Sequence, residues 1–120
     1  MTTSNSITVL ALNPALDVGY EVPQLNADQK VRATTTQYHP GGNGINVSRA
    51  LTRLEAPMHC LSLLGGVSGD VVLQLLGDDF ANSHTWLPVE GGTRVNVTVL
   101  QQSPPGQYEI DSEGPMVSTE

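Results

Sequence analysis

The chain has 120 residues, with 12 acidic and 5 basic side chains and a formal net charge of −7. This balance argues against nucleic acid as a partner, because binding to a phosphate backbone requires many Lys or Arg side chains on one face. The length suits one domain with a modest core. The single cysteine, Cys60, excludes an internal disulfide, and no apolar run approaches the length of a membrane span, so we expect a cytoplasmic protein without membrane contact.

The first apolar run, residues 7–12, predicts a buried strand that ends at Asn13-Pro14. Asp17 follows this run, at the carboxyl end of a strand, where ligands collect in open α/β sheets. From the residues alone, a ligand-binding role and a plain turn or capping role are about equally expected for this aspartate.

Two stretches of alternating residues come next, 18–23 and 30–38, joined by a turn at residues 26–28. Their two-residue period predicts half-exposed strands that form a flap standing off the main sheet. Lys30 and Arg32 would share one face of the second strand, which places two cations side by side. A solvated strand face is the ordinary alternative for such residues.

Residues 39–54 combine a glycine-rich turn with a helix. Glycines at 41, 42 and 44 leave the main chain bare enough for a ligand to approach it closely. The turn is neither a Walker-type P-loop, which needs a lysine, nor a dinucleotide fingerprint, which needs a third glycine where Val47 stands. Apolar residues recur at helical spacing and predict the buried face of the helix: Val47, Ala50, Leu51 and Leu54.

Residues 58–64 form a second apolar run, and Gly65-Gly66 lead into a second helix over residues 69–76, with Ser68 as its expected N-cap. Strand, helix, strand and helix in succession indicate a parallel sheet covered by helices. From residue 84 onward three strands are expected, at 84–89, 93–101 and 107–111. Arg94 opens the middle one and would be an ordinary surface arginine on composition alone. The three histidines stand singly, so we expect no metal site.

Several of these motifs together resemble the ribokinase-like (PfkB) carbohydrate kinases, in particular the phosphofructokinase and tagatose-6-phosphate kinase branch. Pro40-Gly-Gly-Asn-Gly-Ile-Asn-Val-Ser-Arg49 is similar to the signature before the first helix of that branch, and Leu12-Asn-Pro-Ala-Leu-Asp17 is similar to its first strand and substrate aspartate. Lys30-Val-Arg32 resembles its basic pair, and Leu64-Gly-Gly66 followed by Gly69 resembles its second strand-to-helix turn.

The resemblance covers essentially the whole chain and implies an α/β, ribokinase-like fold, made of part of a parallel sheet with flanking helices and a small β-strand lid. Residues 1–120 would be the N-terminal part of a kinase domain, with lid strands at about 18–23 and 30–38. The C-terminal half of the domain would be absent, and with it the catalytic base and most of the ATP site. No catalytic residue and no metal ligand is therefore expected within the chain.

The activity that the resemblance implies is phosphoryl transfer from ATP, with Mg²⁺, to a phosphorylated ketohexose such as fructose 6-phosphate or fructose 1-phosphate. This chain would hold the acceptor and would be inactive alone. The implied substrate contacts are Asp17, Lys30, Gly41, Gly42, Asn43, Asn46 and Arg94, with Arg32 as a further candidate. A homodimer through the lid strands is also implied. The alternative is a standalone sugar-phosphate-binding or dimerisation module derived from the kinase.

Overall fold

The computed structural model describes residues 5–119. The elements are, in chain order, β1 (Ile7–Ala11), β2 (Ala15–Val22), β3 (Thr35–Gly41), α1 (Asn43–Arg53), β4 (Met58–Leu64), α2 (Gly66–Leu76), the 3-10 helix η1 (Ala81–Ser83), β5 (His84–Pro88), β6 (Arg94–Gln101) and β7 (Gly106–Ile110).

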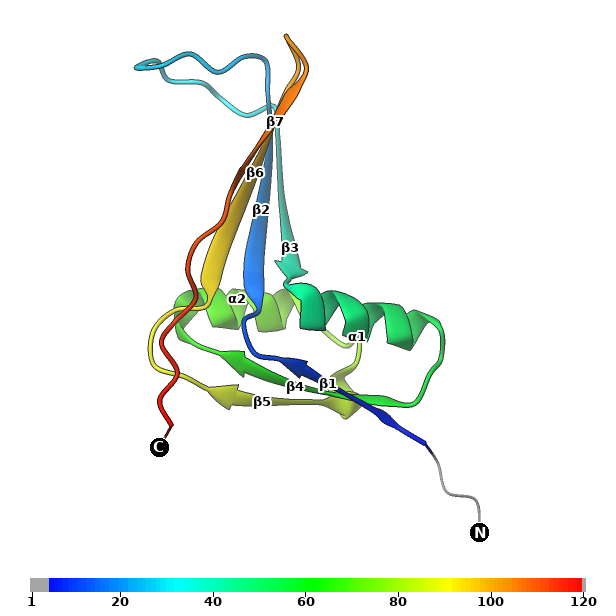
Figure 1. The fold of residues 1–120 in the computed structure, drawn as a ribbon. Coiled ribbons are helices and arrows are strands. Elements are labelled where there is room, and N and C mark those ends of the chain that lie inside the picture. Colours follow the sequence, from blue (N-terminus) through cyan, green and yellow to red (C-terminus); the bar gives the residue numbers. More distant parts are fainter. Residues whose placement is uncertain (1–4, 120) are drawn as a thin grey trace.

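The strands form two sheets. A parallel three-stranded sheet has the order β1-β4-β5, and a mixed four-stranded sheet has the order β3-β2-β6-β7. Figure 1 shows the four-stranded sheet, here called the lid sheet, standing upright on the layer that contains the helices. The expected α/β architecture, with a parallel sheet, flanking helices and a strand lid, is confirmed.

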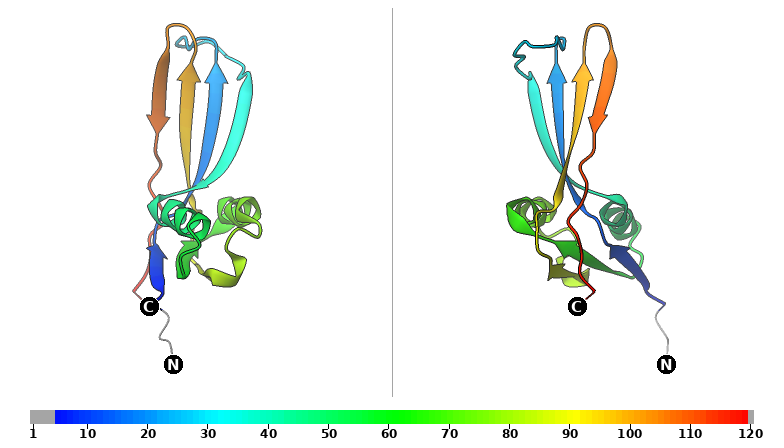
Figure 2. Two further views of the ribbon diagram at one scale, coloured as in Figure 1. Left: turned by 90° about the vertical axis from the view of Figure 1, so that its right-hand side faces the viewer. Right: turned by 60° about the vertical axis from the view of Figure 1, so that its left-hand side comes forward.

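Both long helices lie on the same face of the three-stranded sheet, side by side beneath the lid sheet (Figure 2). The hydrophobic core fills the space between these layers and joins them into one body. It consists of Val9, Ala11, Leu16, Val18, Ile45, Met58, Cys60, Leu64, Val72, Leu76 and Phe80. The base of the lid sheet is therefore fixed by the same core that holds the helices.

The buried face of α1 differs from the one predicted. Ile45 and Ser48 are its buried residues, and of the predicted face Leu51 packs partly buried against the core, whereas Val47 and Leu54 are 49% and 75% exposed. The reason lies in Gly44, where a Cβ atom would overlap the Cα of Ala11 in β1. This close approach fixes the rotation of the helix about its axis, so packing rather than hydrophobicity selects the face turned to the sheet.

The start of α2 also differs from the prediction. The helix begins at Gly66 with Gly65 as its N-cap and without a capping side chain, so Ser68 lies inside the helix. Its hydroxyl donates a hydrogen bond of 2.6 Å to the carbonyl of Thr93. Ser68 thus links the helix to the start of β6 instead of capping the helix.

The lid strands have other bounds than the sequence predicted. β2 already begins at Ala15, so Asp17 lies inside a strand of the lid sheet. β3 begins only at Thr35, and Lys30 and Arg32 lie in the loop of residues 23–34 rather than on a strand face. The expected pair of cations on one strand face is therefore wrong. The turn at residues 26–28 is present, with a hydrogen bond from Gln29 N–H to the Asn26 carbonyl.

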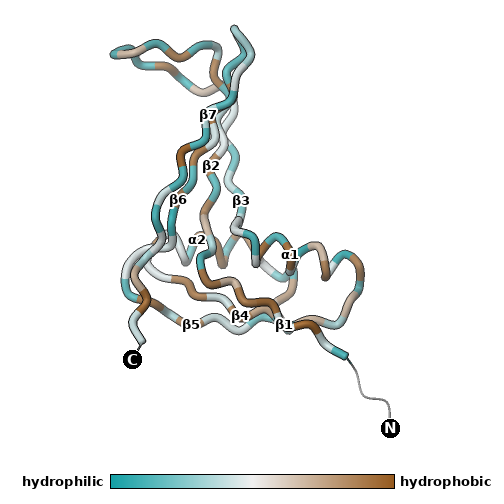
Figure 3. The backbone as a smooth tube through the Cα atoms, in the orientation of Figure 1, coloured by the Kyte–Doolittle hydropathy of each residue, from teal (hydrophilic) through white to brown (hydrophobic). Residues whose placement is uncertain are grey.

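The face of the three-stranded sheet that points away from the helices carries a cluster of leucines. Strand register places leucines of neighbouring strands side by side on it, and Figure 3 shows the hydrophobic colouring along β1. Its members, here called the leucine face, are Leu10, Leu12, Leu61, Leu63 and Leu87, of which Leu10, Leu12 and Leu87 are exposed. Among the described helices, none combines the length and apolar character needed to span a membrane.

Candidate functional site

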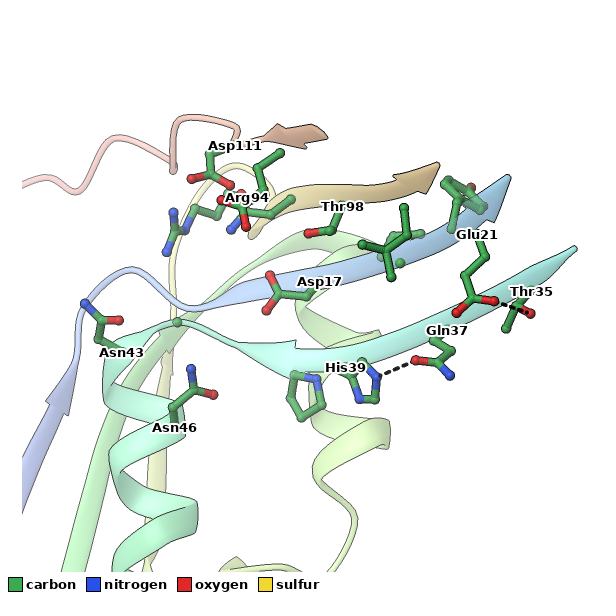
Figure 4. Close-up of a pocket in the computed structure, with 18 of the residues that line it drawn as sticks. Asp17, Glu21, Thr35, Gln37, His39, Asn43, Asn46, Arg94, Thr98 and Asp111 are labelled. Atoms are coloured by element: carbon green, nitrogen blue, oxygen red, sulfur yellow. Dashed lines mark hydrogen bonds between the residues drawn. The ribbon is translucent and has the colours of Figure 1, made fainter. Parts of the chain in front are cut away.

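A groove of about 900 Å³ runs along one face of the lid sheet and ends at the first turn of α1 (Figure 4). Its walls come from β2, β3, β6, β7 and α1. The polar side chains that line it are Asp17, Glu21, Thr35, Gln37, His39, Asn43, Asn46, Arg49, Arg94, Asn96, Thr98, Glu109 and Asp111. The groove therefore offers many hydrogen-bonding groups to a polar ligand of small-molecule size.

The register of the lid sheet arranges the floor of the groove in rows. Asp17 of β2 lies directly opposite His39 of β3 and Asn96 of β6. In the next row Gly19 lies between Gln37 and Thr98. Because directly opposed residues point to the same side of a sheet, with strands about 4.8 Å apart, the first row forms a polar strip across the floor, and in the second row Gly19 leaves a gap between two polar side chains.

Asp17 lies against the backbone of Gly41, the last residue of β3. A Cβ atom at position 41 would overlap the Asp17 carboxylate. Glycine at this position therefore makes room for the carboxylate at the end of the groove where α1 begins. Gly42 follows with a φ of 95°, a left-handed conformation that favours glycine, and turns the chain into the helix.

The first turn of α1 faces the groove. Gly42 is its N-cap and no side chain caps the helix, so the first N–H groups are left without intrahelical partners at the mouth of the groove. Asn43 and Asn46, three residues apart, lie on the same face of the helix and line the groove. This end of the groove is suited to oxygen-rich and anionic ligand groups.

Arg94 lies at the start of β6 and is held from one side. Its Nε donates a hydrogen bond of 3.2 Å to the carbonyl of Asn13, in the turn between β1 and β2. Since this bond uses only the Nε proton, the four N–H groups on the two Nη atoms stay available for an anion in the groove. A second arginine of the lining, Arg49, forms an ion pair with Asp79 at 3.5 Å.

The structure brings most of the predicted site residues together. Asp17, Gly42, Asn43, Asn46 and Arg94 line the groove, and Gly41 lies against the Asp17 carboxylate. Lys30 and Arg32, by contrast, are not among its lining residues.

Sequence reasoning missed several residues of the groove floor, among them His39, Asn96, Glu109 and Asp111. For Asn96 a signal was present, since the two-residue period of residues 94–101 places it on the same face as Arg94. The others depend on which strands pair, which the period of a single strand does not reveal.

Two groups with displaced pKa values lie away from the groove, in β4 and β5. Burial raises the pKa of the Cys60 thiol, against the smaller opposing effect of a hydrogen bond with Ser48. Burial also lowers the pKa of His84, and the nearby His59 adds to this effect. Among residues 5–119, no cluster of three or more His, Cys, Asp or Glu side chains is arranged to hold a metal ion.

Comparison with known proteins identifies the family. The profile of the pfkB family carbohydrate kinases matches residues 8–112. The chain belongs to this family. This PfkB chain is similar to the phosphofructokinase-2 from Escherichia coli in complex with fructose-6-phosphate, with 32% identity and a TM-score of 0.79 over 90% of this chain and 35% of that one.

Two further structures show the same likeness. A putative phosphofructokinase from Staphylococcus aureus is 30% identical with a TM-score of 0.82, over 94% of this chain and 36% of that one. A possible 1-phosphofructokinase from Thermotoga maritima is 30% identical with a TM-score of 0.78, over 94% and 37%. The chain thus spans roughly a third of the length of these relatives.

Proposed function

We propose that this PfkB chain is the acceptor-binding part of a kinase that transfers the γ-phosphoryl group of ATP to a phosphorylated ketohexose, such as fructose 6-phosphate or fructose 1-phosphate. The observation that supports this most directly is the gathering of Asp17, Asn43, Asn46 and Arg94 in one groove, although they come from three separate elements. The relatives whose names specify phosphofructokinases are consistent with a sugar-phosphate acceptor.

Each of the predicted site residues has a chemical role in the proposal. The Asp17 carboxylate, which only accepts hydrogen bonds, and the Asn46 amide would bind sugar hydroxyls. Gly41 and Gly42 would let the backbone close on the sugar beside Asn43. Arg94 would bind the phosphate with paired N–H donors, while Lys30 and Arg32, outside the groove lining, are left as weaker candidates for that contact.

Phosphoryl transfer depends largely on positioning and charge stabilisation, so an acceptor cradle contributes to catalysis without containing a base. ATP would supply the transferred group and Mg²⁺ would neutralise its charge. We assign neither to residues of this chain, because the resemblance implies that the catalytic base and most of the ATP site belong to the C-terminal half of the kinase domain. We therefore expect the 120-residue chain alone to transfer no phosphate in a sensitive coupled assay, and turnover well above a heat-treated control would contradict this.

The proposal is tested by the binding of fructose 6-phosphate and of fructose to the chain, measured by calorimetry or NMR titration. We expect the phosphorylated sugar to bind more tightly. Arg94→Ala should weaken its binding about ten- to a hundredfold, because a charge-assisted contact contributes roughly 1.5–3 kcal/mol. Arg94→Lys should restore only part of this, since an ammonium group lacks the paired donors.

Two further variants serve as contrasts. Asp17→Asn should weaken binding of both sugars and leave the preference for the phosphorylated one largely intact. Arg53→Ala removes a cation from the exposed end of α1, outside the groove lining, and should change neither affinity. If Arg94→Ala still prefers fructose 6-phosphate over fructose, the phosphate does not bind at Arg94.

We also propose that the chain self-associates through the lid sheet and acts in the cytoplasm. The edges β3 and β7 leave backbone groups unpaired, and the face of the lid sheet opposite the groove exposes Tyr38, Tyr108 and Ile110. These features equally support the second candidate, a standalone sugar-phosphate-binding or dimerisation module. The two are separated by the DNA downstream of codon 120. An open frame that encodes a Gly-x-Gly-Asp motif, which the resemblance implies for the second half of the kinase, would exclude the module, and a stop codon would leave the module as a candidate.

A further inference from the structure

Asn96 is the closest strand neighbour of Asp17 on the β6 side of the groove floor. The two residues are directly opposed in the parallel pair of β2 and β6, and both line the groove. Neighbouring strands lie about 4.8 Å apart, and opposed side chains point to the same side of the sheet. A ligand atom that contacts the Asp17 carboxylate from above the floor is therefore within reach of the Asn96 carboxamide.

The orientation of the Asn96 side chain is fixed by the segment that follows β7. The backbone N–H of Ser112 donates a hydrogen bond of 3.1 Å to Asn96 Oδ1. The Ser112 hydroxyl in turn donates one of 2.6 Å to the carbonyl of Val95. A backbone N–H can only donate, so the carbonyl oxygen of the carboxamide must face Ser112, and its NH₂ group is left for the groove.

Asp17 and Asn96 thus present complementary groups side by side. An ionised carboxylate is an acceptor only, whereas an amide NH₂ group is a donor only. A hydroxyl group has one proton to donate and lone pairs to accept, so a single ligand hydroxyl can bond to both residues at once. An ether oxygen or a phosphate oxygen without a proton can satisfy only Asn96.

From this arrangement we infer that Asn96 is a specificity-determining residue that recognises the same ligand hydroxyl as Asp17, by donating to its oxygen while the hydroxyl donates to Asp17. The inference rests on the proposed function, since it takes the ligand to be a ketohexose phosphate. Ser112 acts as a positioning residue for Asn96. The carboxylates of Glu109 and Asp111 line the groove on the β7 side of Asn96, away from Asp17, and the inference assigns them no contact with this hydroxyl.

The test uses fructose 6-phosphate and a set of analogues that each lack one hydroxyl, titrated into the chain by NMR, which covers affinities down to the millimolar range. For the wild-type chain, removal of one particular hydroxyl should weaken binding roughly tenfold or more, because two groups of the site lose their partner. Both Asn96→Ala and Asp17→Asn should bind the parent sugar more weakly and should no longer distinguish it from that one analogue.

Three variants separate the role of the donor from other effects. Asn96→Asp keeps an acceptor for Ser112 but loses the donor, so it should behave as Asn96→Ala does. Asn82→Asp makes the same change of charge at an exposed position outside the groove lining and should retain the wild-type pattern. Ser112→Ala removes the hydroxyl that bonds to Val95 but keeps the backbone N–H that bonds to Asn96. It should therefore reduce the discrimination between the parent sugar and the analogue only in part.

The outcomes distinguish this inference from the proposed function. If the wild-type chain binds no ketohexose phosphate, the proposed function fails. The inference about Asn96 is overturned if the chain binds a ketohexose phosphate and Asn96→Ala still distinguishes the analogues as the wild-type chain does. It is also overturned if Asn96→Ala and Asp17→Asn lose discrimination at different hydroxyls. The NMR spectrum of each variant shows whether it is folded, so a loss of binding is not confused with a loss of structure.

Discussion

Thr93 and Gly65 exchange two hydrogen bonds. The backbone N–H of Thr93 donates to the Gly65 carbonyl at 2.9 Å, and the N–H of Gly65 donates to Thr93 Oγ1 at 3.0 Å. Thr93 is 4% exposed and also accepts, through its carbonyl, the hydroxyl of Ser68. This junction ties the end of β4 and the start of α2 to the residue directly before Arg94, and so fixes the base of β6.

Thr93→Val should destabilise the chain. Valine has the shape of threonine but no oxygen, so the N–H of Gly65 would lose its acceptor in a partly buried place, at a cost of about 1–3 kcal/mol in the free energy of unfolding. Urea denaturation measures this change. Thr36→Val, on the exposed edge strand β3, is the matched control and should change the stability by less than about 0.5 kcal/mol. Equal effects of the two substitutions would contradict a special role of the junction.

Gly41→Ala should displace Asp17, because the added methyl group would overlap its carboxylate. We expect a loss of stability of about 1–3 kcal/mol from overpacking and at least a tenfold loss of affinity for the sugar, since a displaced carboxylate no longer meets the hydroxyl. Thermal unfolding and sugar titration measure the two effects. Gly19→Ala is the stability control, because a Cβ atom at position 19 would have no neighbour within 4 Å. If both substitutions leave stability unchanged, the contact between Gly41 and Asp17 is looser than the structure shows.

The stability of the chain should fall as the pH drops below about 6.5, in part because of His84. Burial lowers its folded-state pKa below the usual value of 6.5, so the unfolded chain binds a proton first as the pH falls, and this favours unfolding. The contribution of His84 to the stability of the folded chain is fully present above pH 6.5 and is lost as the pH falls towards the folded-state pKa. In the folded state His84 Nε2 forms a hydrogen bond of 2.6 Å with Ser62 Oγ, and the His84 ring packs against the Phe80 ring in a T-shaped arrangement.

The free energy of unfolding between pH 7.5 and pH 5 measures this effect, with His84→Gln as the comparison. The variant should lose less stability over this range than the wild-type chain does. A pH dependence that is the same in both would show that other groups account for it.

Self-association should depend on the face of the lid sheet opposite the groove. Sedimentation at increasing concentration is expected to reveal dimers, because exposed Tyr38, Tyr108 and Ile110 lie on an apolar surface flanked by free strand edges. Ile110→Lys should weaken the association. Leu10→Lys, on the leucine face, is the matched control and should leave it unchanged. A chain that stays monomeric, or one whose association responds only to Leu10→Lys, would contradict an interface at the lid.

Much of the fold was predictable from local patterns. The apolar runs of β1 and β4 and the alternation of β6 define strands because their residues must match a buried or half-buried sheet. The glycine-rich turn before α1 was recognisable because glycine alone tolerates its conformation. Asp17, Asn46 and Arg94 were identified through their likeness to family motifs, and the structure brings all three to the same groove.

The tertiary structure decided what local patterns leave open. Residues 30–34 alternate like a strand, but the ladder between β2 and β3 ends at the pair of Glu21 and Thr35, so they remain in the loop. The face that α1 buries depends on its contact with β1 at Gly44. The floor of the groove depends on the pairing of β2 with β6, which makes neighbours of Asp17 and Asn96 although they are far apart in the chain. Such pairings follow from how all elements share one core, and no single segment contains that information.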